Sequence, residues 1–213
     1  VYLKHPNIVQ LKDLIKKEDA IYLVMEYVDG DTLEDYINKI SGPIPEEIAI
    51  PILKEILLAI EYAHEKDVIH LDIKPSNIMI TKDGDIKVLD FGISADLNID
   101  HNDPTMGSPM YMSPEQVKGE KLNLKSDIYS IGITFFQMLT AKFPHPVNGS
   151  RDDLFRSIIK GNLKKIKDFV PWSSIECQNI IDKATKKSTF LRYKDCKEFL
   201  EDVKELEKVY ETS

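Results

Sequence analysis

The sequence predicts an α+β fold that is mostly helical. Two apolar, β-branched runs open the chain at residues 8–14 and 21–28, and two shorter ones follow at 78–80 and 86–89. Apolar and amphipathic segments with helical spacing fill most of the remaining length. The 213 residues are enough for one large or two small domains. Of these residues, 42% are hydrophobic and 30% are charged, which is typical of a globular protein with a buried core.

The first two runs predict an antiparallel hairpin. A charged stretch, Lys16-Lys17-Glu18-Asp19, separates them, and Asp29-Gly30-Asp31 is expected to end the second strand. Thr32 is suited to cap a short helix over residues 33–40, which Gly42-Pro43 closes.

A longer helix is expected to open at Pro45-Glu46-Glu47, because acidic side chains in the first turn interact favourably with the helix dipole. Ile52, Ile56 and Ile60 form its apolar stripe. Pro51 lies within the same stretch, and an interior proline costs about 3 kcal/mol, so we expect a kink or a later helix start.

The two short runs at 78–80 and 86–89 predict strands joined by a turn over residues 82–85, where Gly84 is suited to a positive φ. Residues 93–112 have no periodicity and predict a long loop, which is usually functional when ordered.

Two further helices complete the predicted fold. Ser126 is expected to cap a helix over residues 127–139 that is apolar nearly all round, as in a buried core helix. The last helix, over residues 197–210, is amphipathic, with its apolar side formed by Phe199, Leu200, Val203 and Leu206.

The most informative motif is H-L-D-I-K-P-S-N at residues 70–77, followed by D-F-G at residues 90–92. Asp72 is a candidate to orient an attacking hydroxyl and accept its proton. Lys74 can reach a phosphoryl group and offset its developing negative charge.

Asn77 and Asp90 carry hard oxygen ligands of the kind that Mg²⁺ prefers. Taken alone, each of these residues is more commonly a cap, a turn residue or a surface charge. In this order and at this spacing, they indicate phosphoryl transfer.

These loops resemble the H-R-D-x-K-x-x-N and D-F-G segments of eukaryotic-type serine/threonine protein kinases. H-P-N-I-V at residues 5–9 resembles the segment that leaves the regulatory helix of a kinase, and residues 22–28 resemble its last N-lobe strand and hinge. The resemblance implies a protein kinase-like fold, with residues 1–28 as a remnant of the N-terminal lobe and residues 29–213 as the helical C-terminal lobe.

The resemblance also assigns the nucleotide site. It implies that Met25 is the gatekeeper, that Glu26 and Val28 offer hinge backbone to adenine, and that Met79 floors the adenine pocket. Met25 and Met79 could equally fill the core as ordinary apolar residues.

Further segments match the same family. Residues 107–115 resemble the substrate-binding segment, ending in S-P-E, and the resemblance implies a buried ion pair between Glu115 and Arg192. Residues 126–132 resemble the buried central helix, whose Asp127 would brace the catalytic loop. Lys74 and Ser108 together match the serine/threonine branch.

The chain departs from the family pattern at position 71, where Leu71 replaces the usual arginine. That arginine normally pairs with a phosphorylated activation loop, and Ala95 offers no replacement. A phosphate on Thr105 or Ser108 is therefore not expected to activate this protein through that pocket.

A second departure is that the sequence has neither a G-x-G-x-x-G loop nor a V-A-I-K strand, and Lys4 lies in the wrong context to be the anchoring lysine. We expect the anchoring lysine and its glutamate partner upstream of Val1. The chain is then a truncated form that is inactive or weakly active alone.

These observations predict an enzyme that uses ATP and Mg²⁺ to phosphorylate serine or threonine hydroxyls of protein substrates. One alternative is a catalytically inactive kinase-like scaffold, although a scaffold has no need for the intact set of polar residues. The other is a metal-dependent hydrolase built on His70 and Asp72, but the sequence has no H-E-x-x-H, and its other histidines lack ligand spacing.

Charge and cysteine content limit the binding partners and the cellular location that we expect for the protein. The net charge of -8 and the pI of about 5.2 disfavour a nucleic-acid-binding surface and hint at a basic protein partner. Cys177 and Cys196 lie in helical sequence, and there is no signal peptide or apolar run of membrane-spanning length. We therefore expect a cytoplasmic protein.

Overall fold

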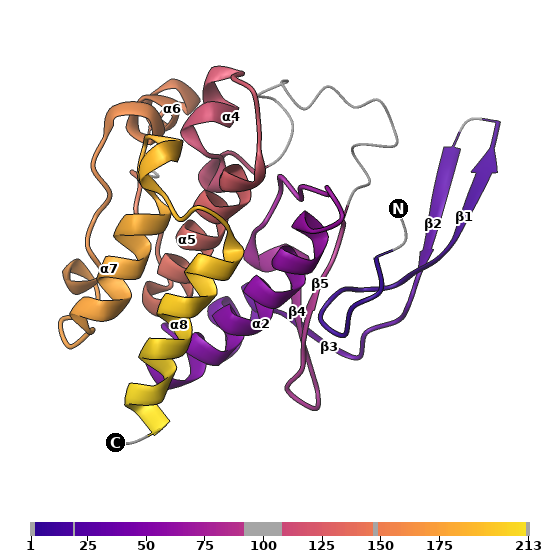
Figure 1. The fold of residues 1–213 in the computed structure, drawn as a ribbon, viewed down its shortest axis with the longest axis horizontal. Helices are drawn as coiled ribbons and strands as arrows, with labels where there is room; N and C mark the ends of the chain where they lie inside the picture. Colours follow the sequence, from indigo (N-terminus) through magenta and orange to yellow (C-terminus); the bar gives the residue numbers. More distant parts are fainter. Residues whose placement is uncertain (1–2, 19, 92–107, 147–148, 212–213) are drawn as a thin grey trace.

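Helices form the body of the molecule, and a two-stranded hairpin projects from one side of it (Figure 1). The computed structural model describes residues 3–18, 20–91, 108–146 and 149–211. The main elements, in chain order, are β1 Leu11–Lys17, β2 Ala20–Met25, β3 Gly30–Thr32, α1 Leu33–Asp35, α2 Glu46–His64, β4 Ile78–Thr81, β5 Ile86–Val88, α4 Pro114–Lys118, α5 Leu124–Thr140, α6 Arg151–Lys160, α7 Ile175–Ala184 and α8 Cys196–Glu211.

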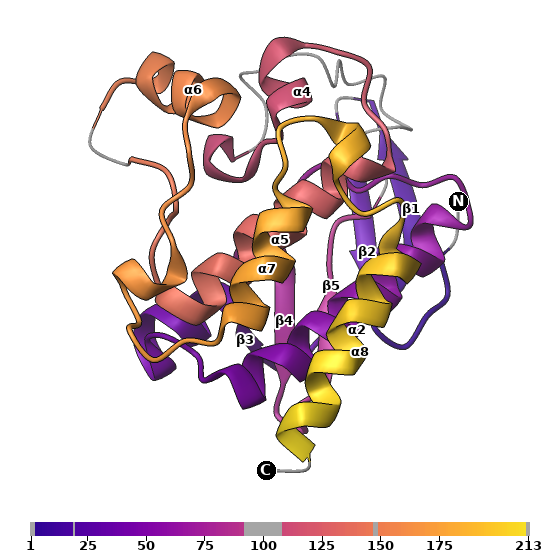
Figure 2. The same ribbon diagram turned by 60° about the vertical axis from the view of Figure 1, so that its left-hand side comes forward.

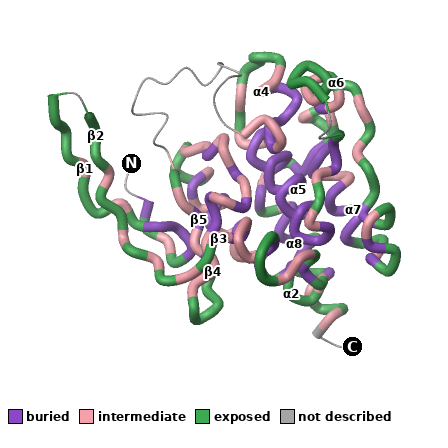
Figure 3. The backbone as a smooth tube through the Cα atoms, turned by 180° about the vertical axis from the view of Figure 1, so that it is seen from behind, coloured by how far each residue is buried: buried purple, intermediate pink, exposed green. Residues whose placement is uncertain are grey.

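The hairpin formed by β1 and β2 confirms the first prediction. Its strands pair antiparallel, from Leu11 opposite Met25 to Lys17 opposite Ala20. Most residues of the hairpin are exposed (Figure 3). The large apolar residues among them include Tyr22. A two-stranded hairpin is marginally stable by itself, so these strands gain little from their own packing.

The expected end of the second strand was wrong, because β2 ends at Met25 and residues 30–32 form a separate strand. This strand, β3, pairs antiparallel with β4, and a Cβ at Gly30 would lie 2.1 Å from the carbonyl oxygen of Ile80. Thr32 caps α1 as predicted, with its Oγ1 accepting the N–H of Asp35 at 3.0 Å. After α1 the chain continues in a π-helical segment, Tyr36–Ser41.

The strands β4 and β5 confirm the second predicted pair, and Gly84 in their turn has φ 90°. The start of the chain is fixed to β5. Val9 donates its N–H to the carbonyl of Val88 at 2.9 Å, and Val88 donates to the carbonyl of Asn7 at 2.8 Å. Asn7 also donates its side-chain amide to the carbonyl of Ile86 at 2.9 Å.

The helix α2 begins at Glu46, so the expectation of a later start was wrong. Pro51 lies inside the helix on an exposed position. The carbonyl that it leaves without its usual partner belongs to Glu47, which is also exposed, so water can satisfy it.

The helix α5 is the buried centre of the body, and every residue from Ser126 to Thr140 is buried. It begins three residues earlier than predicted, at Leu124 in place of Asp127, because the cap is Asn123, whose Oδ1 accepts the N–H of Lys125 at 2.9 Å. The hydroxyl of Ser126 instead donates to the carboxylate of Glu115 at 2.9 Å.

The amphipathic helix α8 confirms the last predicted element and lies along α2 (Figures 1 and 2). It buries Phe199 and Val203 completely, and Glu207 forms an ion pair with Lys54 of α2 at 2.6 Å. Both cysteines are free and buried. Among the helices in the described ranges, none combines the length and apolar character needed to cross a membrane.

Candidate active site

The loop that follows α2 is held in place by Asp127 of α5, whose side chain is fully buried. Its carboxylate accepts the backbone N–H groups of His70 at 2.9 Å and Leu71 at 2.7 Å. Nε2 of His64 lies 2.8 Å from the same carboxylate. This arrangement confirms that Asp127 braces the loop predicted to be catalytic.

Three of the predicted residues meet in this loop. Nζ of Lys74 donates to Oδ2 of Asp72 at 2.6 Å and to Oγ of Ser108 at 2.9 Å. Nδ2 of Asn77 donates to the carbonyl of Asp72 at 2.9 Å and to its Oδ2 at 3.1 Å. Oδ1 of Asp72 has no hydrogen-bond partner within the described part of the chain, so it can accept a proton from a substrate.

Asp90 is connected to this cluster through the backbone of Leu89. The N–H of Leu89 donates to the carbonyl of Asn77 at 2.9 Å, and its carbonyl lies 2.8 Å from Nε2 of His70. Asp90 itself has φ 62° and is exposed. The ring of Phe91 packs edge-on against His70, with centroids 4.7 Å apart. Gly92, the last residue of D-F-G, lies outside the described residues.

His70 uses both ring nitrogens in this framework. Nε2 faces the carbonyl of Leu89, and Nδ1 accepts the N–H of Asp72 at 3.3 Å. The side chain is also only 2% exposed. His70 is therefore a structural residue of the loop, and the metal-dependent hydrolase hypothesis loses one of its two supporting residues.

The donor set fits a magnesium ion shared with phosphate groups. Both side-chain hydrogen bonds of Asn77 use its amide nitrogen, which leaves Oδ1 available. The Asp90 carboxylate has no hydrogen bond or ion pair to any described residue. No cluster of three or more His, Cys, Asp or Glu in the described ranges could hold a metal. Mg²⁺ typically takes one or two carboxylates together with substrate phosphates and water, which matches this sparse set.

The predicted hinge residues lie at and directly after the end of β2. Met25 ends β2 and is 37% exposed. Glu26 donates its N–H to the carbonyl of Gln10 at 2.9 Å, while its Oε1 accepts from Lys87 at 2.9 Å. Burial raises the pKa of Glu26, but the Lys87 ammonium and the Gln10 N–H lower it below its ordinary value.

The hinge is linked to the predicted floor of the adenine pocket through β5. Lys87, which pairs with Glu26, lies opposite Met79 in the register of β4 and β5. The carbonyl of Glu26 and the N–H of Val28 have no partner in the described ranges. Each of the two residues whose backbone the resemblance assigned to adenine thus has a backbone group that is free within the described ranges.

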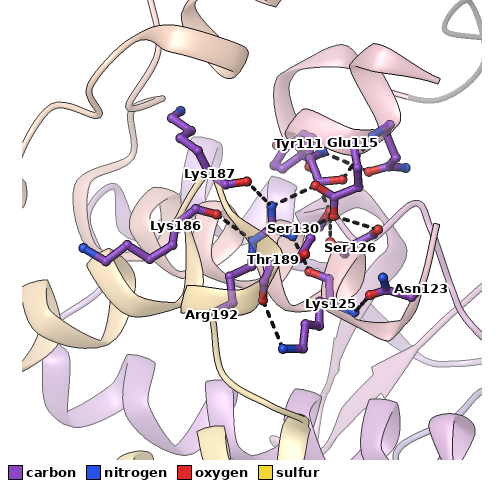
Figure 4. A network of polar contacts seen from close by, with 12 residues as sticks. Tyr111, Glu115, Asn123, Lys125, Ser126, Ser130, Lys186, Lys187, Thr189 and Arg192 are labelled. Atoms are coloured by element: carbon purple, nitrogen blue, oxygen red, sulfur yellow. Dashed lines mark hydrogen bonds and ion pairs between the residues drawn. The ribbon is translucent and has the colours of Figure 1, made fainter. Parts of the chain in front are cut away.

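The predicted ion pair between Glu115 and Arg192 is confirmed, and both residues are buried (Figure 4). Nη1 donates to Oε1 at 2.6 Å and Nη2 donates to Oε2 at 2.8 Å. Burial raises the pKa of Glu115, but the hydrogen bonds and charge of Arg192 lower it below its usual range. This pair joins α4, in the predicted substrate-binding segment, to the residues that precede α8.

Sequence reasoning missed two residues of the site, His64 and Gln116. Gln116 accepts the N–H of Ser113 at 2.9 Å and donates its amide to the carbonyl of Leu71 at 3.0 Å. The pattern S-x-x-Q at residues 113–116 is a capping-box signature and would have predicted the first contact. No local pattern predicts the second, which joins residues 45 positions apart.

Thr105 and Ala95, on which the expectation about activation by phosphate depended, lie outside the described residues. Ser108 is described, and its hydroxyl already contacts Lys74. The expectation about the phosphate pocket therefore stays a prediction.

A family model described as the protein kinase domain matches residues 2–206. Serine/threonine-protein kinase PrkC of Bacillus subtilis is 40% identical over 205 residues, covering 95% of this chain and 31% of the relative. "Probable serine/threonine-protein kinase PknB" of Lactococcus lactis is 37% identical over 204 residues, covering 94% and 32%. Serine/threonine-protein kinase PknB of Mycolicibacterium smegmatis is 40% identical over 151 residues, covering 67% and 24%.

The chain spans about a third of the length of the first two relatives. Its match to the family model nevertheless covers nearly all of the sequence, and the braced loop, the Glu115–Arg192 pair and the buried α5 are those that the resemblance implied. The chain belongs to the protein kinase domain family.

Proposed function

We propose that this domain transfers the γ-phosphoryl group of ATP to serine or threonine hydroxyls of protein substrates. The observation that carries the proposal is the Asp72 carboxylate, which Lys74 and Asn77 hold through Oδ2 while Oδ1 stays open. The printed names of the relatives, all serine/threonine-protein kinases, support the same activity.

The proposed reaction places Asp72 beside the substrate hydroxyl. The hydroxyl oxygen forms a bond to the γ-phosphorus, the bond from that phosphorus to the oxygen of the departing ADP breaks, and the hydroxyl proton passes to Asp72. Lys74, held between Asp72 and Ser108, offsets the negative charge that develops on the phosphoryl oxygens. Positioning by this loop supplies most of the expected catalytic effect.

We propose that Asn77 and Asp90 hold Mg²⁺ with the phosphates of ATP. The metal, when bound, neutralises phosphate charge and orients the γ-phosphoryl group. Leu89 keeps the two residues in register, because its N–H is bonded to the carbonyl of Asn77 and Asp90 follows directly.

Residues 1–28 then form the nucleotide side of the site and residues 29–213 the helical lobe. The free carbonyl of Glu26 and N–H of Val28 would contact adenine, with Met25 behind the ring and Met79 beneath it. We also place the protein in the cytoplasm, which is supported by two buried free cysteines.

A calorimetric titration of the full-length protein with ATP, with and without Mg²⁺, tests this assignment. Asp90→Asn should weaken the Mg²⁺-dependent affinity by about tenfold or more, because it removes a charged ligand. Asp72→Asn should bind ATP as the wild type does, because Asp72 faces the hydroxyl. Asp83→Asn, an exposed acid in the β4–β5 turn, is the matched control.

Two results would count against the proposal. Undiminished Mg²⁺-dependent affinity in Asp90→Asn would remove Asp90 from the metal site. If the wild-type protein binds no ATP either with or without Mg²⁺, the alternative of a catalytically inactive kinase-like scaffold would be favoured.

A further inference from the structure

The peptide group that joins Leu71 to Asp72 is held at both ends. Its carbonyl, from Leu71, accepts the side-chain amide of Gln116 at 3.0 Å. Its N–H, from Asp72, donates to Nδ1 of His70 at 3.3 Å. Side chains from two different segments therefore fix the orientation of the peptide that carries Asp72.

This peptide needs external support because Leu71 has φ 65°. A left-handed conformation is unfavourable for a leucine and persists only where the surroundings impose it. Asp127 holds the N–H of Leu71, but it does not fix the carbonyl on the other side of that residue. Gln116 is the described side chain that does so.

Gln116 uses both ends of its planar amide. Oε1 accepts the N–H of Ser113 and completes the capping box of α4, while Nε2 donates to Leu71. Capping requires only the oxygen. The nitrogen contributes nothing to the cap. Its contact with the carbonyl of Leu71 therefore has a role other than capping.

We propose that Gln116 is a positioning residue that couples the substrate-binding segment to Asp72. The proposal rests on the role of Asp72 given under the proposed function. Ser113 is fully buried, so the cap fixes the carbonyl end of the Gln116 amide, and the amide then transmits the position of α4 to the Leu71–Asp72 peptide. A displacement of about 1 Å at a catalytic group costs up to about a hundredfold in rate.

Gln116→Glu separates the two functions of this side chain. It keeps an oxygen for the N–H of Ser113, but it places a second oxygen against the carbonyl of Leu71 where a donor was. Ser113→Ala is the matched variant, because it weakens the cap and keeps the amide donor. The measurements are kcat, KM for ATP and for a peptide substrate, and the melting temperature of the full-length protein.

We expect Q116E to lower kcat by about tenfold while KM for ATP stays within about twofold. S113A should lower the melting temperature more than Q116E does. It should lower kcat less than Q116E does. The deficit of Q116E should shrink as pH falls, because protonation of the introduced carboxyl restores a donor. A residue that served only to cap the helix would show neither the fall in kcat in Q116E nor its dependence on pH.

Wild-type kcat in Q116E, or a kcat loss in S113A as large as that in Q116E, would overturn the inference. Gln116→Met provides a second test without added charge, and it should lower kcat at least as much as Q116E does. If Asp72→Ala abolishes turnover while Q116E and Q116M do not lower kcat, only this inference fails. If Asp72→Ala retains turnover, the proposed function fails instead.

Discussion

The carboxylate of Asp127 accepts the N–H of Leu71 at 2.7 Å while Leu71 is held at φ 65°. The same carboxylate contacts His70 and His64, so one buried side chain supports a strained turn immediately before Asp72. Strained backbone of this kind is maintained by its surroundings, often at functional sites. The position of Asp72 therefore depends on a residue that lies more than fifty positions later in the chain.

Asp127→Asn should disturb this support without changing the shape of the side chain. An amide presents one oxygen where the carboxylate presents two, so at least one of the three donors loses its acceptor. We expect a loss of about 2–4 kcal/mol in the free energy of unfolding and at least a tenfold fall in kcat. Urea denaturation and steady-state kinetics measure these changes, with the exposed Asp152→Asn as control. Unchanged kcat would show that the loop does not need this brace.

Glu115→Gln should leave Arg192 buried without a counter-charge. Breaking such a pair from one side costs about 3–5 kcal/mol in unfolding free energy. Because the folded pKa of Glu115 is lowered, its stabilisation is present above the unfolded carboxyl pKa and is lost as pH falls through the folded value. Denaturation at pH 7 and through the acid range checks both statements. Lys194→Gln, at an exposed ion pair, should cost less than about 1 kcal/mol.

His145 should make the free energy of unfolding depend on pH a second time, at higher pH than Glu115 does. Burial and the nearby Lys187 charge lower its pKa to about 4, and its ring nitrogens contact Tyr129 and Ser157. In the unfolded chain it takes up a proton near pH 6.5, so stability should fall as pH drops from 6.5 to 4, by up to about 3 kcal/mol. His145→Gln should flatten the denaturation profile across this window. An unaltered profile in the variant would contradict the assignment.

Gly132→Ala should destabilise the protein although alanine favours helices. An added Cβ would lie 2.8 Å from Cγ2 of Thr185 and 2.9 Å from Cβ of Ala184, so α5 and α7 would have to separate. Overpacking of this kind costs about 1–3 kcal/mol, against a helix-propensity gain of about 1 kcal/mol. Chemical denaturation gives the sign of the change in unfolding free energy directly. A stabilised variant would show that α5 and α7 are loosely packed at this contact.

The sequence correctly placed the polar residues of the loop together because they are close in the chain. Asp72, Lys74 and Asn77 lie within six positions, so one loop conformation brings them together whatever the rest of the fold does. The contact between Glu115 and Arg192 is long-range, and only the resemblance to a known family predicted it.

The predictions that failed depended on contacts far away in the chain. Gly30 and Asp31 have little strand propensity, and residues 30–32 become a strand only because β4, nearly fifty residues later, offers them hydrogen-bond partners. The cap of α5 was misplaced because Asn123 and Ser126 are both good capping residues. The hydroxyl of Ser126 donates to the buried carboxylate of Glu115, and Asn123 caps the helix. The contact of Gln116 with Leu71 depends on the same kind of distant packing.

The most direct test of the central claim is phosphoryl transfer from γ-labelled ATP by the full-length protein and its Asp72→Asn variant. The wild-type protein should label serine and threonine, as identified by phosphoamino-acid analysis, and Asp83→Asn should do the same. Asp72→Asn should bind Mg²⁺·ATP normally but transfer less than about 1% as much label. Wild-type levels of transfer by Asp72→Asn would contradict the account.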